Sequence, residues 1–196
     1  MLRIACDLDG TLADLSSAYR KIEGRLQSDS DGVVWDAIRG IPDFWTTLDP
    51  LEPGVIRRLF ELSVAGQWEV FFVTQRPITA GETVQRQTQR WLMTHGFETP
   101  SVVTMPGSRG RAALALDLDF LIDDLPRNCV DVVSDSRCRP LLVSRGADAE
   151  GEETAARFKI SVVRSVSEAL DLLTASTAAP VDDSFSQRML RRLGLG

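Results

Sequence analysis

Short runs of apolar residues recur along the chain, and most of them stop at a polar or turn-forming residue. Runs bounded in this way are typical of strands buried in a sheet. Residues 68–73, for example, are rich in aromatic and β-branched side chains and stop at Thr74-Gln75-Arg76-Pro77, where proline opposes further extension. We predict strands at residues 2–6, 68–73, 101–104, 120–122, 140–143 and 160–163.

Apolar residues at helical spacing separate these runs. Between residues 12 and 26 they recur at Leu15, Tyr19, Ile22 and Leu26, which is the spacing of one helix face. A capping-box pattern at Ser165-Val166-Ser167-Glu168 indicates the start of a final helix. We predict helices at residues 12–26, 53–66, 82–95, 110–116 and from 165 onward, a short apolar segment at 33–38, and an exposed loop over the acidic residues 147–153.

The alternation of strands and helices predicts the fold class. A strand, a helix and a parallel strand are joined almost always by a right-handed crossover. We therefore expect an α/β fold with a doubly wound parallel sheet that helices cover on both faces. Ligands of such sheets bind beyond the carboxyl ends of the strands, so the residues that follow the strands are the first candidates for chemistry.

Composition and charge narrow the class of protein. The 196 residues are 43% hydrophobic and 26% charged, which fits one globular core with a small insertion. The net charge of -6 and the scattered Lys and Arg residues argue against a polymeric nucleic acid as partner. The three cysteines lack zinc spacing and no charged-then-apolar leader opens the sequence, so we expect a cytoplasmic protein. No apolar run approaches the length of about 20 residues that a membrane-spanning helix needs, so we do not expect the chain to cross a membrane.

Two pairs of carboxylates follow predicted strands. Asp7 and Asp9 lie two residues apart after the first strand, and Gly10 lets the backbone approach a ligand closely. These carboxylates would repel a phosphate unless a divalent cation is present, and oxygen ligands suit Mg²⁺. Asp123 and Asp124 follow a second buried strand, and one of them would ligate the metal while the other orients it.

Several further residues are candidates for contact with a phosphate. The Thr74 hydroxyl at a strand end can donate to a phosphoryl oxygen. Arg109 and Arg111 flank Gly110 at the start of a predicted helix, and either can supply a cation. Other candidates, next to these motifs in the sequence, are Gly10, Thr11, Gln75 and Arg76, of which Arg76 would add a second phosphate contact.

These motifs resemble, in order, the four motifs of the haloacid dehalogenase superfamily, over residues 2–173. They are Asp7-Leu8-Asp9-Gly10-Thr11, the strand that ends in Thr74, the basic residue Arg109, and Ile122-Asp123-Asp124. Within the superfamily the chain looks most like the 5′(3′)-deoxyribonucleotidase branch, through Phe44-Trp45, residues 48–54 and residues 121–124. Two departures are an arginine where the third motif usually has lysine, and Gln75-Arg76-Pro77 in place of small residues.

The resemblance implies a role for each carboxylate. Asp7 would form an aspartyl-phosphate, and Asp9 would protonate the leaving oxygen and then activate water. Metal ligation would involve Asp7, the Asp9 carbonyl and Asp124, with Asp123 behind them. An acid such as Asp9 is needed to expel an alkoxide but not a halide, so phosphate-ester hydrolysis is favoured over carbon–halogen chemistry.

The resemblance also implies a domain organisation. A core would comprise residues 1–14 and 51–175, and residues 15–50 would form a helical cap that closes over the site and selects the substrate. Phe44 and Trp45, together with Trp35, would then offer rings on which a base can stack. Residues 176–196 would form a flexible tail, in which Met189, Leu190 and Leu193 suggest a short amphipathic helix.

Together these observations predict a Mg²⁺-dependent phosphomonoester hydrolase. The expected partner is a small phosphorylated metabolite, with (deoxy)nucleoside monophosphates as the leading class and a monomer or homodimer as the expected state. One alternative is a phosphatase of sugar phosphates or other small-metabolite phosphates, because nothing in the cap specifies a base. Another is a catalytically silent member of the superfamily that binds phosphate ligands.

Overall fold

A computed structural model describes residues 1–27, 30–66, 68–146 and 148–178 of the chain. These residues belong to two compact units, Met1–Gly107 and Ser108–Gly196. The predicted cap, residues 15–50, lies inside the first unit together with part of the predicted core. The boundaries between core and cap therefore stay predictions. The expected helix around Met189, Leu190 and Leu193 lies outside the described residues.

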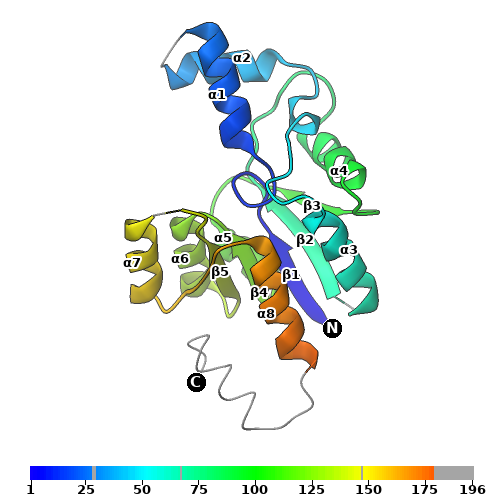
Figure 1. Ribbon diagram of the computed structural model, residues 1–196, viewed down its shortest axis with the longest axis vertical. Coiled ribbons are helices and arrows are strands. Elements are labelled where there is room, and N and C mark those ends of the chain that lie inside the picture. The colour runs from blue at the N-terminus through cyan, green and yellow to red at the C-terminus, as the bar shows by residue number, and fades with distance from the viewer. Residues whose placement is uncertain (28–29, 67, 147, 179–196) are drawn as a thin grey trace. The chain divides into compact units, whose positions relative to one another are not determined.

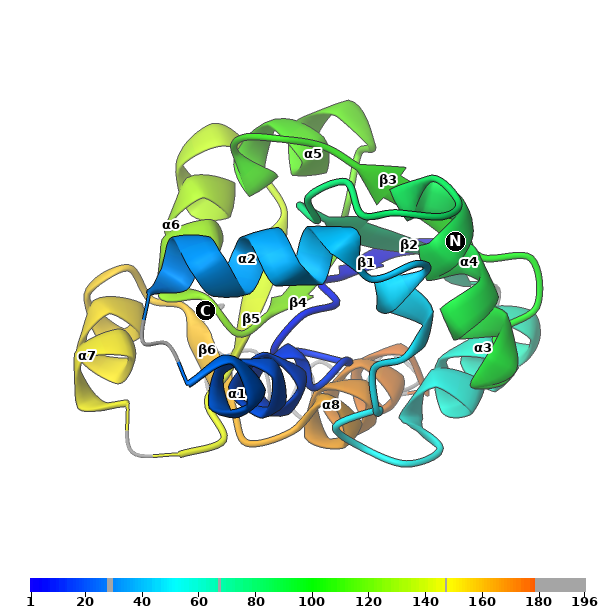
Figure 2. The ribbon, with the colours of Figure 1, turned by 90° about the horizontal axis from the view of Figure 1, so that it is seen from above.

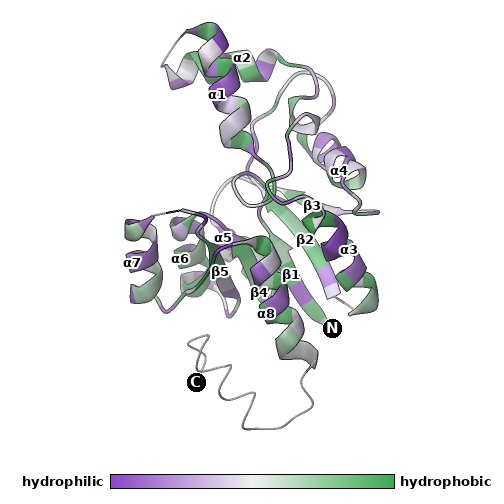
Figure 3. Cartoon of the chain, in the orientation of Figure 1, coloured by the Kyte–Doolittle hydropathy of each residue, from purple (hydrophilic) through white to green (hydrophobic). Residues whose placement is uncertain are grey.

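The first unit contains a parallel sheet in the order β3-β2-β1 (Figure 1). Its strands are β1 (Leu2–Cys6), β2 (Trp68–Thr74) and β3 (Ser101–Thr104), as the apolar runs predicted. Leu2 pairs with Trp68, and Thr74 pairs with Thr104. The helices α3 (Val55–Ala65) and α4 (Val84–Thr94) pack against this sheet. Figure 3 shows that β1 and β2 are largely hydrophobic, in agreement with their burial.

Two further helices of the first unit lie beyond the carboxyl ends of β1 and β2 (Figure 1). They are α1 (Leu15–Leu26) and α2 (Asp31–Gly40), which contact one another, and a 3₁₀ turn η1 (Phe44–Thr46) follows them (Figure 2). The base of this segment closes where Ala13 bridges Pro50 and where the Asp14 amide donates to the Asp49 carbonyl at 2.9 Å. Helix α1 begins at Leu15 and not at Leu12 because Asp14 caps it, accepting the Ser17 amide at 2.9 Å.

The second unit contains three parallel strands in the order β4-β5-β6. They are β4 (Phe120–Asp123), β5 (Arg139–Val143) and β6 (Ser161–Val163), which again follow the predicted runs. Cys129, Leu142, Ala155 and Ile160 form a buried cluster between the strands and helices of this unit. Its helices are α5 (Arg109–Ala115), α6 (Pro126–Asp135), α7 (Ala149–Arg157) and α8 (Val166–Ala178).

Two helices of the second unit differ from the sequence predictions. The exposed loop predicted over residues 147–153 is wrong, because α7 begins at Ala149 after Asp148 accepts the Gly151 amide at 2.9 Å. Glu150 and Glu152 in its first turn favour a helix start, since acidic groups complement the amino-terminal end of the helix dipole. Helix α6 was not predicted, because among its residues only Cys129 and Val132 are buried and they give a weak helical stripe.

The predicted α/β class with parallel strands is confirmed. In the first unit the strands are added in chain order from β1 outward, and in the second unit from β4 outward, with a helical segment before each added strand. This outward winding of parallel strands is typical of a doubly wound sheet. Among the described residues, no helix is both long enough and apolar enough to span a bilayer.

Candidate active site

The first group of candidate residues lies in the loop that follows β1. Asp7 is the first residue after this strand and is only 4% exposed. The Leu8 carbonyl accepts the backbone amides of Leu12 and Ala13, each at 2.7 Å, so the loop curls tightly. Gly10 lies in this curl at a φ of 92°, a conformation that residues with a side chain rarely adopt. The predicted pair of carboxylates is therefore held on a rigid turn at a strand end.

Asp9 is held by an arginine from the loop that follows β2. Arg76 donates from Nε to Asp9 Oδ2 at 2.9 Å and from Nη2 to Asp9 Oδ1 at 2.7 Å. The Arg76 side chain has no exposed surface and that of Asp9 is 16% exposed, so the pair is largely shielded from water. Thr74 Oγ1 lies 3.5 Å from Asp9 Oδ2. Two residues expected to contact phosphate, Thr74 and Arg76, are thus placed against the predicted acid–base carboxylate.

The rings of Phe44 and Trp45 are interior side chains. They are 2% and 0% exposed, and they pack edge to face with centroids 5.0 Å apart. Trp45 donates from Nε1 to the Pro77 carbonyl at 3.1 Å, and the Arg76 guanidinium lies 4.7 Å from a Trp45 ring centroid. Because so little of either residue is exposed, we do not assign their rings to base stacking. Trp35 is half-buried and packs on Tyr19, with centroids 5.6 Å apart.

A cavity of about 650 Å³ opens beside the carboxyl ends of β2 and β3. Gln75, which is exposed, lies on its wall, so this candidate for substrate contact faces space that a ligand can enter. None of the described residues that line the cavity is aromatic. The lining consists of Gln75, Arg76, Pro77, Ile78, Thr83, Val84, Gln85, Thr104, Met105 and Pro106.

The second group of candidate residues belongs to the second unit. Asp123 is the last residue of β4 and is fully buried, whereas Asp124 after it is half-buried. Arg109, the first residue of α5, is 5% exposed, and its Nε lies 3.8 Å from Asp123 Oδ2. Arg111 is exposed. Either arginine could supply the cation on sequence grounds, and Arg109 is the one that lies beside a candidate carboxylate.

Asp123 is surrounded by hydrogen-bond donors. It accepts the Leu125 amide at 2.8 Å, and Asn128 Nδ2 lies 3.1 Å and 2.9 Å from its two oxygens. Burial raises the pKa of Asp123 to about 7, and Asp124 adds to this rise, while the Leu125 amide, Arg109 and Asn128 oppose it. A buried carboxylate beside a second carboxylate fits a divalent cation, whose charge would favour the ionised form of both. Asp123 and Asp124 are therefore suitable ligands or supports for such an ion.

Comparison with solved structures supports the fold assignment. The chain is similar to a Thermotoga maritima protein provisionally assigned as a β-phosphoglucomutase, with a TM-score of 0.54 and 15% identity over 89% of this chain and 99% of that one. No protein-family model and no curated protein sequence matches the chain. At this level of identity the likeness concerns the fold alone.

The sequence pattern points to the candidate residues but not to their partners. Neither Asn128 behind Asp123 nor Thr88, whose Oγ1 accepts a hydrogen bond from Arg76 Nη1 at 2.9 Å, was predicted. Both partners come from helices, α6 and α4, that follow the strand bearing the candidate residue. A polar residue on the buried face of such a helix is the one signal that would have pointed to them.

Proposed function

We propose that this protein is a Mg²⁺-dependent phosphomonoester hydrolase of the haloacid dehalogenase superfamily that acts through an aspartyl-phosphate on Asp7. The observation that carries the proposal is the placement of carboxylate pairs directly after two parallel strands, with Asp7 and Asp9 after β1 and Asp123 and Asp124 at the end of β4. Doubly wound sheets bind ligands beyond these strand ends. The order of the motifs along the chain adds independent support.

The reaction follows from the roles of the two carboxylates after β1. An Asp7 oxygen attacks phosphorus, the bond from phosphorus to the ester oxygen breaks, and Asp9 gives its proton to that oxygen so that it leaves as an alcohol. Asp9, now ionised, takes a proton from a water molecule, whose oxygen attacks the phosphorus. The bond between phosphorus and Asp7 then breaks, which releases inorganic phosphate and restores the Asp7 carboxylate.

Asp7, Asp123 and Asp124, with the Asp9 carbonyl, are the proposed holders of the divalent ion. The bound ion would offset the negative charge of the phosphate and of the carboxylates around it. Asn128 and the Leu125 amide already donate hydrogen bonds to the carboxylate oxygens of Asp123, so Asp123 suits an orienting role. The half-buried Asp124 suits direct ligation of the ion. The remaining donors proposed for the phosphate are Arg109, the Thr74 hydroxyl, and the loop residues Gly10 and Thr11.

The substrate class has two candidates. The nucleotidase-like sequence around Phe44-Trp45 favours nucleoside monophosphates, but the burial of both rings removes the base-stacking surface on which that preference would depend. A cavity without aromatic lining next to Gln75 favours a sugar phosphate or another small phosphorylated metabolite. We therefore propose non-nucleotide metabolite phosphates as the second candidate class.

Phosphate release from a panel of nucleoside monophosphates and sugar phosphates, with and without Mg²⁺, tests this function. We expect Mg²⁺-dependent release that disappears in Asp7→Asn, and the preferred ester identifies the substrate class. Release that persists in Asp7→Asn would refute the covalent mechanism. Binding of phosphate esters without any turnover would instead support the catalytically silent alternative.

A further inference from the structure

We propose that Arg76 is a positioning residue for Asp9 and does not bind the substrate phosphate. It would hold the acid–base carboxylate in one orientation and connect it to the segment that follows the inserted helices α1 and α2. This inference rests on the proposed function, because it assigns Asp9 a proton-transfer role. It differs from the sequence prediction, in which Arg76 is a second phosphate contact.

The geometry of the pair favours positioning. Nε and Nη2 of Arg76 lie 2.9 Å and 2.7 Å from the two different oxygens of Asp9, which is the parallel, two-bond arrangement of an arginine fork. Two parallel bonds fix the plane of the carboxylate as well as its distance. Each carboxylate oxygen has two lone pairs, so Arg76 leaves one on each oxygen for the proton that Asp9 exchanges.

The guanidinium is itself anchored away from Asp9. Its Nη1 donates to Thr88 Oγ1 at 2.9 Å, and the Trp45 ring lies beneath it with the centroid 4.7 Å from Cζ. The Arg76 side chain has no exposed surface. Turning this fork toward a phosphate would break three hydrogen bonds and leave Asp9 without its partner, and an uncompensated buried charge is costly. Arg76 is therefore built to stay in place.

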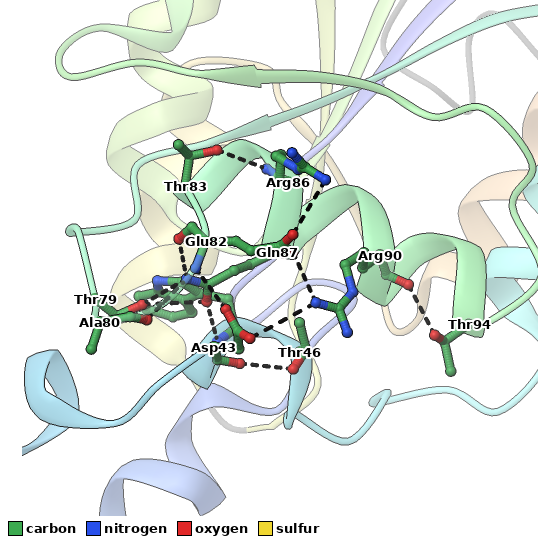
Figure 4. A network of polar contacts seen from close by, with 11 residues as sticks. Asp43, Thr46, Thr79, Ala80, Glu82, Thr83, Arg86, Gln87, Arg90 and Thr94 are labelled. Carbon is green, nitrogen blue, oxygen red and sulfur yellow. Dashed lines mark hydrogen bonds and ion pairs between the residues drawn. The ribbon is translucent and has the colours of Figure 1, made fainter.

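Trp45 is in turn fixed by helix α4. Its backbone amide donates to Gln87 Oε1 at 3.1 Å, and the Gln87 side-chain amide donates to the Glu82 carbonyl at 2.6 Å. Asp43, two residues before Trp45, accepts the Glu82 amide at 2.8 Å (Figure 4). The 3₁₀ turn that follows α2 is thus bonded to α4 and to the loop before it. Trp45 links that turn to Arg76, and through Arg76 to Asp9.

This arrangement predicts which chemical step depends on Arg76. Asp9 gives a proton to the leaving oxygen, so displacing Asp9 should slow the cleavage of esters whose leaving group needs that proton. A 4-nitrophenolate leaves readily without protonation, whereas an alkoxide does not. The ratio kcat/KM covers the steps up to departure of the leaving group, so it separates this effect from the later attack of water on Asp7.

The test compares 4-nitrophenyl phosphate with an alkyl phosphate in Arg76→Lys and Arg76→Gln. We expect kcat/KM for the alkyl ester to fall about 10²-fold, as small displacements of catalytic groups do. For 4-nitrophenyl phosphate we expect a loss below about fivefold, because the acid contributes little to a good leaving group. The inhibition constant of inorganic phosphate should not change. The matched control is Arg86→Gln on α4, since Arg86 is exposed and pairs only with Glu82 in the described contacts.

Equal losses for both esters, together with weaker inhibition by phosphate, would overturn the inference and make Arg76 a phosphate ligand. A wild type that hydrolyses no phosphate ester would refute the proposed function itself. The ion pair is tested separately, without turnover, by the melting temperatures of Asp9→Asn, Arg76→Gln and the double variant. We expect the melting temperature of the double variant to shift by less than the sum of the two single shifts. Additive shifts would show that the pair does not form.

Discussion

The pair of Asp9 and Arg76 predicts that a residue of the candidate active site stabilises the fold. In Asp9→Asn the buried guanidinium loses its counter-charge, although the asparagine carbonyl can still accept one of its two hydrogen bonds. Breaking a buried pair by removing one partner costs about 3–5 kcal/mol. Because one bond remains and Asp9 is 16% exposed, we expect a loss at or just below the lower limit of that range, about 2–3 kcal/mol. For a chain of this size the melting temperature should fall by about 4–12 °C.

Thermal unfolding followed by circular dichroism measures this loss, with Asp36→Asn as the matched control. Asp36 forms an ion pair with Arg39 at 2.6 Å, but both side chains are more than half exposed. Removing such a surface pair should change the free energy of unfolding by less than about 0.5 kcal/mol. Raising the salt concentration should weaken the surface pair and leave the buried one nearly unchanged. If Asp9→Asn melted at or above the wild-type temperature, the pairing of Asp9 with Arg76 would be refuted.

Three further predictions concern the second unit. Arg109→Leu should lower kcat/KM for phosphate esters at least about 10²-fold because Arg109 is buried beside Asp123, whereas Arg111→Leu should stay near wild type, and similar losses in both would contradict the assignment. Asn128→Leu removes donors from Asp123, so the Mg²⁺ concentration for half-maximal activity should rise about 10–100-fold, and an unchanged Mg²⁺ titration would argue against this support. Burial raises the pKa of Cys138 to about 12, so its thiol should resist alkylation at pH 8.5 until the protein unfolds. The free energy of unfolding should fall as the pH rises above the thiol pKa of the unfolded chain, because only the unfolded state then releases the proton. Fast labelling of native Cys138 would contradict this.

Strands were predicted from sequence more reliably than helices in this protein. Every predicted strand is present because each is a short segment dominated by apolar residues, such as residues 68–73 of β2, and burial on both faces favours such segments in a parallel sheet. Helices α6 and α7 were missed because they bury few residues, two of the described residues in each. Their starts depend on local features, Pro126 and the Asp148 cap, that also occur in loops.

The candidate site shows the same division between local and long-range information. Asp7, Asp9, Asp123 and Asp124 could be named from sequence because strand ends and acidic pairs are local patterns. The partner of Asp9 could not, since Arg76 is 67 residues away from it and lies only two residues after the predicted phosphate contact Thr74. For the same reason Phe44 and Trp45 were predicted to offer a stacking surface. Their burial depends on packing with α4 and with the end of β2, which a pattern of aromatic residues does not reveal.

The most direct test of the central claim is to look for the phosphoryl group on Asp7. The protein is mixed with Mg²⁺ and its preferred phosphate ester, quenched in acid within one turnover, and digested for mass spectrometry. We expect a phosphorylated peptide in which Asp7 carries the group, and its loss in Asp7→Asn. With 4-nitrophenyl phosphate, whose leaving group needs no proton, the phosphorylated peptide should also accumulate in variants of Asp9 that cannot activate water. Turnover of the ester without phosphate on Asp7, or with Asp7→Asn still active, would contradict the proposed mechanism.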